Sequence, residues 1–441
     1  MPAKNITVIP ATINLHTRIP KAATTFRKVA GYARVSTDSE EQLTSYEAQV
    51  DYYTRYIRSR PDWQFVDVYT DEGISATNSI AKPHTIKKFE LIERYVETWA
   101  QKLLQNSWCE GIVFIDCMCN SGMYTTEDGE PVFGTPIRVS RKLRDAAGQY
   151  PKKKIYVYLN DNNAEKIDLL QQHLPKESSN FYYCLTAQDA NERLKEIGPK
   201  LSAKKQFHFF LLYDPYDASI DWTALAPFFQ NWGEVLINHM VSDTVRAVKQ
   251  AKKQETIKKY EGTYLSDFDS LLPHGSDRIA YERRVEQIIT MLKGGPRRRY
   301  FVSAFPVFNT RNALVYDLVH CTSNIAGFRL YKSTAWKTFG DKSSTKNTHG
   351  SEDLFFFDLD GSGALKTNTD ERCYYIKDIA DYLQNYFSGR KNVSFSELWD
   401  LLDGHPVFPS EGYRKQIRAE LQSRFGAEVS RSTISFKDRR F

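Results

Sequence analysis

The feature that most constrains the fold is a regular alternation of short apolar runs with amphipathic segments between residues 111 and 253. The apolar runs have the length of strands, and the segments between them have helical spacing. Strands that alternate with helices form a mostly parallel sheet with helices on both faces. The predicted strands are 111–116, 154–160, 181–187, 207–215 and 233–239, and two more follow at 299–308 and 313–321. We therefore predict an α/β protein with a Rossmann-like sheet of seven strands.

Changes in composition and in the pattern of predicted elements divide the chain into four predicted regions. Residues 1–27 carry lysine and arginine but no acidic residue, which indicates a basic N-terminal arm. Residues 28–79 hold two predicted strands and a helix over 42–60. Residues 80–345 form the sheet domain, beginning with a long amphipathic helix and interrupted by a partly helical insertion at about 262–295. Residues 346–441 comprise a linker and three short helices that end in a basic strand, the pattern of a winged-helix-like module.

Composition excludes several classes of protein. The chain has no apolar run long enough to cross a bilayer, and its first residues lack the apolar core of a signal peptide. We therefore expect a cytoplasmic protein without a membrane partner. The six cysteines lack paired C-x-x-C spacing, which argues against a zinc cluster or a disulfide framework, and we predict no metal site.

The net charge of +6 is unevenly distributed along the chain. Basic residues cluster at 245–254, at 296–299 and in the tail over 413–441. Such clusters suit the phosphate backbone of DNA or RNA, although a lysine-rich helix face is often only solvated. Nucleic acid is therefore one predicted partner.

Three predicted strands end in residues suited to ligand binding. In an open parallel sheet, ligands bind beyond the carboxyl ends of the strands. The first strand ends at Asp116 and leads to Gly122, and the second ends at Asn160 and Asp161, where an acidic side chain suits the hydroxyls of a ribose. An ordinary polar turn would also explain each loop taken alone. Together, one strand–helix unit apart, the two loops indicate an adenosine-type cofactor.

The fourth strand, 207–215, carries the sharpest signal, because its apolar run meets the sequence Asp214-Pro215-Tyr216. Methylation of an amino group needs a hydrogen-bond acceptor for the nitrogen and an aromatic ring to stack on a planar substrate. Asp214, Pro215 and Tyr216 supply an acceptor, a rigid turn and a ring. The alternative is a proline-rigidified loop after a buried strand.

Residues 80–441 resemble the three-Cys-motif partner (TcmP) family. The resemblance rests on the segments KPHTIKKFELIERYVETW, FIDCMCNSGMY, GTPIRV, FFLLYDPYD and NTRNALVYDLVHCTSNIAGFRLYKSTAWK, which occur in the family's order. It implies an S-adenosylmethionine (SAM)-dependent methyltransferase-like fold and a three-Cys-motif protein as partner. The residues it implies at the methionine end of the cofactor are Asp116, Cys119, Asn120 and Gly122; Asp161 would lie near the ribose, beside Asn160. It also puts Asp214, Pro215 and Tyr216 at the reacting centre.

One departure from the family pattern concerns the loop after the first strand. The family usually has two glycines there, and Asn120 takes the place of the first. Asparagine tolerates a left-handed backbone better than most residues. Two hypotheses therefore stay open: a methyltransferase acting on nucleic acid or in a nucleic-acid-processing or defence system, and a non-catalytic scaffold for a three-Cys-motif protein.

The segment from Lys28 to Asn78 resembles the start of large serine recombinases, on the strings YARVST and DEGISATN. The resemblance implies Ser36 as nucleophile and Arg34 as a group that stabilises charge on a DNA phosphate. That chemistry needs several arginines around one phosphate. The later strand with paired arginines and the long oligomerisation helix are absent, so we interpret residues 28–79 as a truncated recombinase-like segment. A DNA-binding recombinase, inactive in cleavage, is the third hypothesis.

Overall fold

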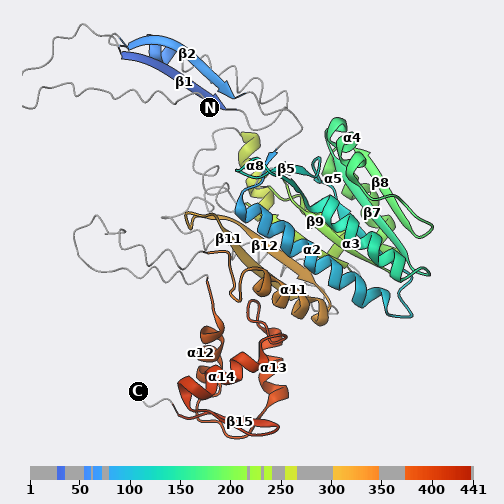
Figure 1. The fold of residues 1–441 in the computed structure, drawn as a ribbon, viewed down its shortest axis with the longest axis vertical. Coiled ribbons are helices and arrows are strands. Elements are labelled where there is room, and N and C mark those ends of the chain that lie inside the picture. Colours follow the sequence, from blue (N-terminus) through green and yellow to red (C-terminus); the bar gives the residue numbers. More distant parts are fainter. Residues whose placement is uncertain are drawn as a thin grey trace, which may run out of the picture. The chain divides into compact units, whose positions relative to one another are not determined.

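A computed structural model describes residues 27–34, 54–60, 63–71, 79–215, 219–229, 233–240, 254–265, 301–346 and 373–438. The chain divides into two compact units, Met1–Ser75 and Ala76–Phe441, and each is described by itself. Figure 1 shows the elements of both units in sequence colours. Most of the predicted insertion, the predicted helix at 242–253, and the clusters at 245–254 and 296–299 lie outside the described residues, apart from Gln254.

The N-terminal unit contains the two strands predicted for it. Strand β1 (Arg27–Arg34) pairs in parallel with β2 (Trp63–Asp71), and residues 54–58 between them are helical. Arg34 is the last residue of β1, and Ser36 lies outside the described residues. A parallel pair requires a crossover connection, and the predicted helix at 42–60 occupies that position in the sequence.

The second unit is built on the predicted seven-stranded sheet. Its strands are β4 (Gly111–Asp116), β7 (Lys154–Asp161), β8 (Phe181–Ala187), β9 (Phe207–Tyr213), β10 (Gly233–His239), β11 (Phe301–Phe308) and β12 (Leu314–Thr322). They lie in the order β11-β12-β10-β9-β4-β7-β8. All neighbouring pairs from β8 to β10 are parallel, whereas β12 runs antiparallel to both β10 and β11.

This strand order defines the fold class. Numbered along the chain, the strands from β8 to β10 follow the order 3-2-1-4-5 of doubly wound nucleotide-binding folds. The last strand, β12, is inserted antiparallel between the fifth strand and the sixth, as in Rossmann-like methyltransferases. The predicted α/β class with a Rossmann-like, methyltransferase-type sheet is confirmed. The order reverses direction between β4 and β9, which makes their carboxyl ends the expected ligand crevice.

Helices cover both faces of the sheet, as predicted (Figure 1). One core contains side chains of α2 (Pro83–Leu104), α3 (Thr135–Gln149), α4 (Ala164–His173) and α11 (Ile325–Thr338). The other contains side chains of α5 (Ala190–Ser202), α6 (Trp222–Leu225), the 3-10 turn Ala226–Phe229 and α8 (Gln254–Tyr264). The strands alternate their side chains between these two cores, which is why the strand sequences are apolar throughout.

A small second sheet was not predicted. Strands β5 (Met123–Thr125) and β6 (Pro131–Phe133) form a hairpin directly after the loop that follows β4, and β3 (Ser79–Ile80) pairs with β5. The signal for the hairpin is the dipeptide Asp128-Gly129, where Gly129 has a φ of 86°. The hairpin separates the loop from helix α3, so this helix does not follow the loop directly.

The C-terminal region has the predicted three helices and additional short strands. They are α12 (Ile376–Tyr386), β13 (Val393–Ser394), α13 (Phe395–Gly404), α14 (Arg414–Phe425), β14 (Glu428–Val429) and β15 (Thr433–Ser435). The strands form an antiparallel sheet in the order β13-β15-β14.

A buried lysine attaches this region to the sheet domain. Lys332 of α11 is fully buried, and its Nζ donates to the carbonyl oxygens of Leu402, Asp403 and His405 at 2.8, 3.2 and 2.6 Å. These carbonyls lie at the end of α13, where a helix carries partial negative charge. The ammonium therefore finds an acceptor for each of its three protons, although burial lowers its pKa to about 7.

Among the described residues, no helix combines the length and the apolar character needed to span a membrane. All six cysteines are free thiols, and four of them, including Cys119, are buried.

Two glycines with left-handed backbone give a matched test of the fold. A Cβ on Gly122 would lie 2.9 Å from Leu170 Cδ1 and 3.0 Å from Ile137 Cδ1, whereas a Cβ on Gly129 would meet nothing within 4 Å. Both substitutions to alanine strain the backbone by about 1 kcal/mol, but only Gly122→Ala also overpacks the core, by about 1–3 kcal/mol. We expect Gly122→Ala to lower the free energy of unfolding by more than Gly129→Ala in urea denaturation. Equal losses would contradict the packing described for this loop.

Candidate functional site

A cavity of about 270 Å³ lies at the carboxyl ends of β4 and β9, where the strand order reverses. Residues from α2, the loop after β4, the end of β9, the end of β10 and the start of β12 surround it. The lining residues are His84, Thr85, Lys88, Met118, Asn120, Tyr124, Asp214, Pro215, Asn238, Met240, Val315 and Tyr316. The cavity therefore brings together Asn120, Asp214 and Pro215 of the sequence-predicted site. Tyr216 lies outside the described residues.

Asp214 is held by two donors from different elements. Lys88 Nζ of α2 donates to Asp214 Oδ2 at 2.5 Å, and Asn238 Nδ2 of β10 donates to Asp214 Oδ1. The Lys88 side chain is 9% exposed and the Asp214 side chain 23%, so water screens this ion pair only in part. Each carboxylate oxygen keeps a second lone pair, which leaves Asp214 able to accept one further hydrogen bond from the cavity.

Asp116 is the second carboxyl group at this edge. It is 2% exposed, and its Oδ1 accepts a hydrogen bond from the backbone N–H of Met118 at 3.2 Å. Burial, and then the negative charge of Asp214, raises the pKa of Asp116 to about 8. At neutral pH the Asp116 carboxyl is therefore mostly protonated, and a neutral acid lies beside the charged Lys88–Asp214 pair.

The loop after β4 has the conformation that a pair of glycines would give. Asn120 has a φ of 56° and Gly122 a φ of 67°, both in the left-handed region. The backbone N–H of Asn120 donates to Asp161 Oδ2 at 3.0 Å, and the Asn120 side chain accepts from the N–H of Ser121 at 2.7 Å. Asparagine therefore keeps the glycine-type backbone and makes a local hydrogen bond there.

Asp161 and Asn160, at the end of β7, hold this loop in place through hydrogen bonds. The Asp161 side chain is 0% exposed, and its second oxygen accepts from the N–H of Asn163 at 3.1 Å. Asn160 donates from Nδ2 to the carbonyl oxygens of Cys117 and Gln188. The backbone carbonyl of Asn160 accepts from the N–H of buried Cys119 at 2.9 Å. These residues fix the loop through its backbone, and a ligand's hydroxyl would reach Asp161 only by displacing one of the bonds described.

Sequence reasoning missed Lys88, Asn238 and Tyr316. Lys88 Nζ lies 5.3 Å from the centre of the Tyr316 ring, and the Tyr316 hydroxyl donates to the carbonyl of His84 at 3.2 Å. A signal for Lys88 exists in the sequence, because it precedes Ile92 and Tyr95 by four and seven residues, on the buried stripe of α2. A lysine on an apolar stripe needs a buried acceptor. Nothing in the sequence identifies that acceptor as Asp214.

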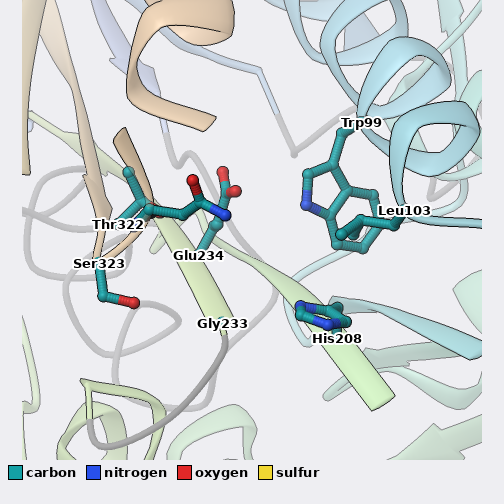
Figure 2. Close-up of a pocket in the computed structure, with 8 residues that line it drawn as sticks. Trp99, Leu103, His208, Gly233, Glu234, Thr322 and Ser323 are labelled. Atoms are coloured by element: carbon teal, nitrogen blue, oxygen red, sulfur yellow. Dashed lines mark hydrogen bonds between the residues drawn. The ribbon is translucent and has the colours of Figure 1, made fainter. Parts of the chain in front are cut away.

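A second, much smaller space, drawn in Figure 2, lies at the amino ends of β9 and β10, opposite the carboxyl ends that hold the cavity. Its volume of about 20 Å³ has room for about one water molecule. Figure 2 shows Trp99 and Leu103 of α2 facing residues at the start of β9 and β10, including His208 and Glu234. Glu234 is buried and accepts hydrogen bonds from Tyr95 and His320. This space is too small for a nucleotide-sized ligand, so the cavity at the carboxyl edge is the candidate site.

Comparisons with known proteins concern each part of the chain separately. The family model described as Resolvase, N terminal domain, matches residues 29–96. This match supports the predicted recombinase-like segment coarsely and extends beyond residue 79 into helix α2. A search among curated proteins finds no match.

Several solved structures are similar to the chain at low identity. A Legionella pneumophila protein of family DUF519 has 9% identity and a TM-score of 0.35, covering 59% of this chain and 93% of its own. Human methyltransferase-like protein 13 in complex with SAH has 8% identity and a TM-score of 0.29, covering 57% and 91%. A loganic acid methyltransferase with SAH has 9% identity and a TM-score of 0.25, covering 58% and 83%. We therefore assign the fold class from the strand order of this chain and not from these similarities.

The Lys88–Asp214 pair can be tested with adjacent lysines. Lys88→Met removes the cation beside Asp214 and Asp116, and we expect a loss of about 2–4 kcal/mol in the free energy of unfolding. Lys87→Met is the control, because Lys87 is 46% exposed and, among the residues that the structure describes, pairs only with Glu90 on the same helix. Its effect should stay within about 0.5 kcal/mol. Urea denaturation measures both, and a Lys88→Met protein as stable as Lys87→Met would show that the buried pair does not stabilise the fold.

The raised pKa of Asp116 predicts a dependence of stability on pH. The unfolded chain loses this proton near the ordinary pKa of about 4, whereas the folded protein keeps it up to about pH 8. The contribution of Asp116 is therefore complete below pH 4 and is lost, by at most about 1.4 kcal/mol per pH unit, as the pH rises to 8. Asp116→Asn stays neutral and should lack this loss. Urea unfolding of both proteins at pH 5.5 and 7.5 measures the difference, and parallel changes would contradict it.

Proposed function

We propose that the chain is a SAM-dependent methyltransferase of the three-Cys-motif partner type that acts on an amino group of nucleic acid. The observation that carries this proposal is the position of Asp214-Pro215, which lies beside the left-handed loop 119–122 in one cavity at the reversal of the strand order. In doubly wound sheets this edge is where a cofactor and a substrate meet.

The loop fits the cofactor through its backbone. Asn120 and Gly122 both have positive φ, so this loop lacks the glycine pair but keeps the corresponding backbone conformation. Asn120 and Met118 line the cavity, and Asp116 lies next to it, close enough to Asp214 to raise its own pKa. We assign Met118, Asn120 and Gly122 to the methionine end of SAM, with Asp161 and Asn160 supporting the loop. When bound, SAM supplies the methyl group.

Asp214 is the residue we assign to the acceptor nitrogen. Its carboxylate is oriented by Lys88 and Asn238, and it retains lone pairs that can accept a hydrogen bond from an amino N–H. If the methyl group passed from the sulfur of SAM to the nitrogen, the S–CH3 bond would break and S-adenosylhomocysteine would leave; Asp214 would hold the N–H that the nitrogen loses in a hydrogen bond until the proton passes to water. Lys88 and Asn238 hold the Asp214 carboxylate in one orientation for this purpose. Pro215 rigidifies the turn, and Tyr216 would stack on the base.

A non-catalytic partner subunit of a three-Cys-motif protein is the second candidate. The observation that favours it is that Asp161, the residue expected to hold a ribose, is fully covered and bonded to backbone amides. In that role the sheet domain is a scaffold, and the cavity at its edge takes no cofactor.

Isothermal titration calorimetry with SAM distinguishes the two candidates. We expect the wild-type protein to bind SAM, and Asn120→Gly to bind it at least as tightly, because glycine keeps the positive φ and removes a side chain from the cavity wall. Asp214→Asn should retain SAM binding and lose methyl transfer to nucleic acid, measured with a radiolabelled methyl group.

The absence of heat at millimolar SAM from both wild type and Asn120→Gly would refute the methyltransferase proposal. Co-purification of that protein with a three-Cys-motif protein would then support the scaffold role.

A further inference from the structure

The C-terminal module presents a helix face that is exposed in the part of the chain that the structure describes. The order of its elements is helix, strand, two helices, then two strands joined by the short turn 430–432. Its contacts with α11 come from the end of α13 and the segment 405–413, through Lys332, Ser333 and Trp336. Helix α14 buries Ile417 and Leu421 inside the module, so its opposite face is turned to solvent.

The exposed face of α14 carries polar side chains and small ones. Lys415, Gln416, Ala419, Gln422 and Ser423 are all exposed. Lys415, Ala419 and Gln422 follow one another at helical spacing, with Gln416 and Ser423 alongside. Within the part of the chain that the structure describes, the side chains of Lys415, Gln416 and Gln422 have no hydrogen bond or ion pair. Two free amide groups and a small residue in the middle of a helix face suit close approach to base edges, since glutamine reads adenine by paired hydrogen bonds.

Charge is distributed unevenly along the sequence of the module. Residues 413–438 contain six lysines and arginines against three acidic residues, whereas residues 373–412 contain three against six. The acidic residue of α14, Glu420, lies 4.0 Å from Arg424 Nε. Arg431 is exposed in the turn between β14 and β15. Helix α14 and this turn therefore both belong to the basic segment of the module, residues 413–438.

Two arginines of α14 are held in place by aromatic rings. The guanidinium of Arg414 lies 5.3 Å from the centre of the Trp399 ring, and that of Arg418 lies 5.3 Å from Phe395. A ring contact uses the flat face of the guanidinium and leaves its N–H edge free for phosphate oxygens. Ordering these side chains before binding reduces the entropy lost on binding.

We propose that α14 and the 430–432 turn bind duplex DNA, with α14 in the major groove, Gln416 and Gln422 facing the base edges, and Arg414, Lys415 and Arg431 on phosphates. The width of the major groove admits one helix. A single-stranded partner is disfavoured, because it is bound by exposed aromatic rings, and none of the exposed large hydrophobic side chains of the described residues lies on α14 or the turn. The binding of DNA by α14 does not depend on the proposed function. Only the role of the bound DNA as methyl acceptor rests on that function.

The test uses the full-length protein and a fluorescein-labelled duplex of mixed sequence, with binding measured by fluorescence anisotropy at several salt concentrations. Lys415→Glu with Arg431→Glu should weaken binding at least about tenfold near 100 mM salt and reduce the slope of log K against log salt by about two. Lys152→Glu with Lys205→Glu is the matched control, because both lysines are exposed and lie in the sheet domain, outside α14 and the turn. Its affinity should fall much less.

A second pair of variants tests the placement of α14. Gln416→Ala with Gln422→Ala should keep the salt slope and change the sequences enriched from a pool of randomised duplexes. The proposal is overturned if the wild type does not bind the duplex, if it prefers single-stranded RNA, if the control loses as much affinity as Lys415→Glu with Arg431→Glu, or if enrichment is unaffected by the glutamine changes. SAM calorimetry on Lys415→Glu with Arg431→Glu separates this outcome from the methyltransferase proposal, because the surface lies outside the cavity.

Discussion

Polar contacts fix helix α2 to the sheet, and the candidate site depends on the one that Lys88 makes. Lys88 bonds Asp214 at the end of β9, and Tyr95 bonds Glu234 on β10. The two residues are seven positions apart, about 10 Å along the helix axis. Apolar packing alone would let a helix slide or rotate over a sheet. Two specific partners at this spacing allow only one position, and that position puts the ammonium of Lys88 inside the cavity.

The carboxyl edge of the sheet concentrates acidic groups, and two lysines lie beside them: Lys88 pairs with Asp214, and Lys166 Nζ lies 3.9 Å from Asp161 Oδ1. Asp116, Asp161 and Asp214 all lie at the carboxyl edge of the sheet, and each is stabilised differently. Asp161 is bonded by backbone amides, Asp214 by Lys88 and Asn238, and Asp116 by remaining protonated. Burial of three like charges would otherwise be prohibitive. Of the three carboxyl groups, Asp214 is the one that lines the cavity.

The sequence predicts the sheet well because its information is local. Apolar runs such as 111–116 and turn residues such as Asn163 specify strands and helix starts without reference to distant parts of the chain. The cavity depends on pairs far apart, such as Lys88 with Asp214 and Asn120 with Asp161, which one sequence cannot reveal. The loop itself was predictable only in part: its left-handed backbone follows from Asn120 and Gly122, whereas the burial of Asp161 follows from the packing of α4 and the loop around it.

The C-terminal module packs directly against helix α11 of the sheet domain. Strand β12 begins at the cavity with Tyr316 and leads directly into α11, whose Lys332 and Trp336 bond carbonyl groups of the module. Lys332 uses all three donors and Trp336 its single one, so a rotation of the module would leave a buried charge without acceptors. The α14 surface therefore keeps a fixed orientation relative to the cavity. A duplex bound to α14 would be presented to the sheet domain in one orientation, which restricts the nucleotides that can reach Asp214.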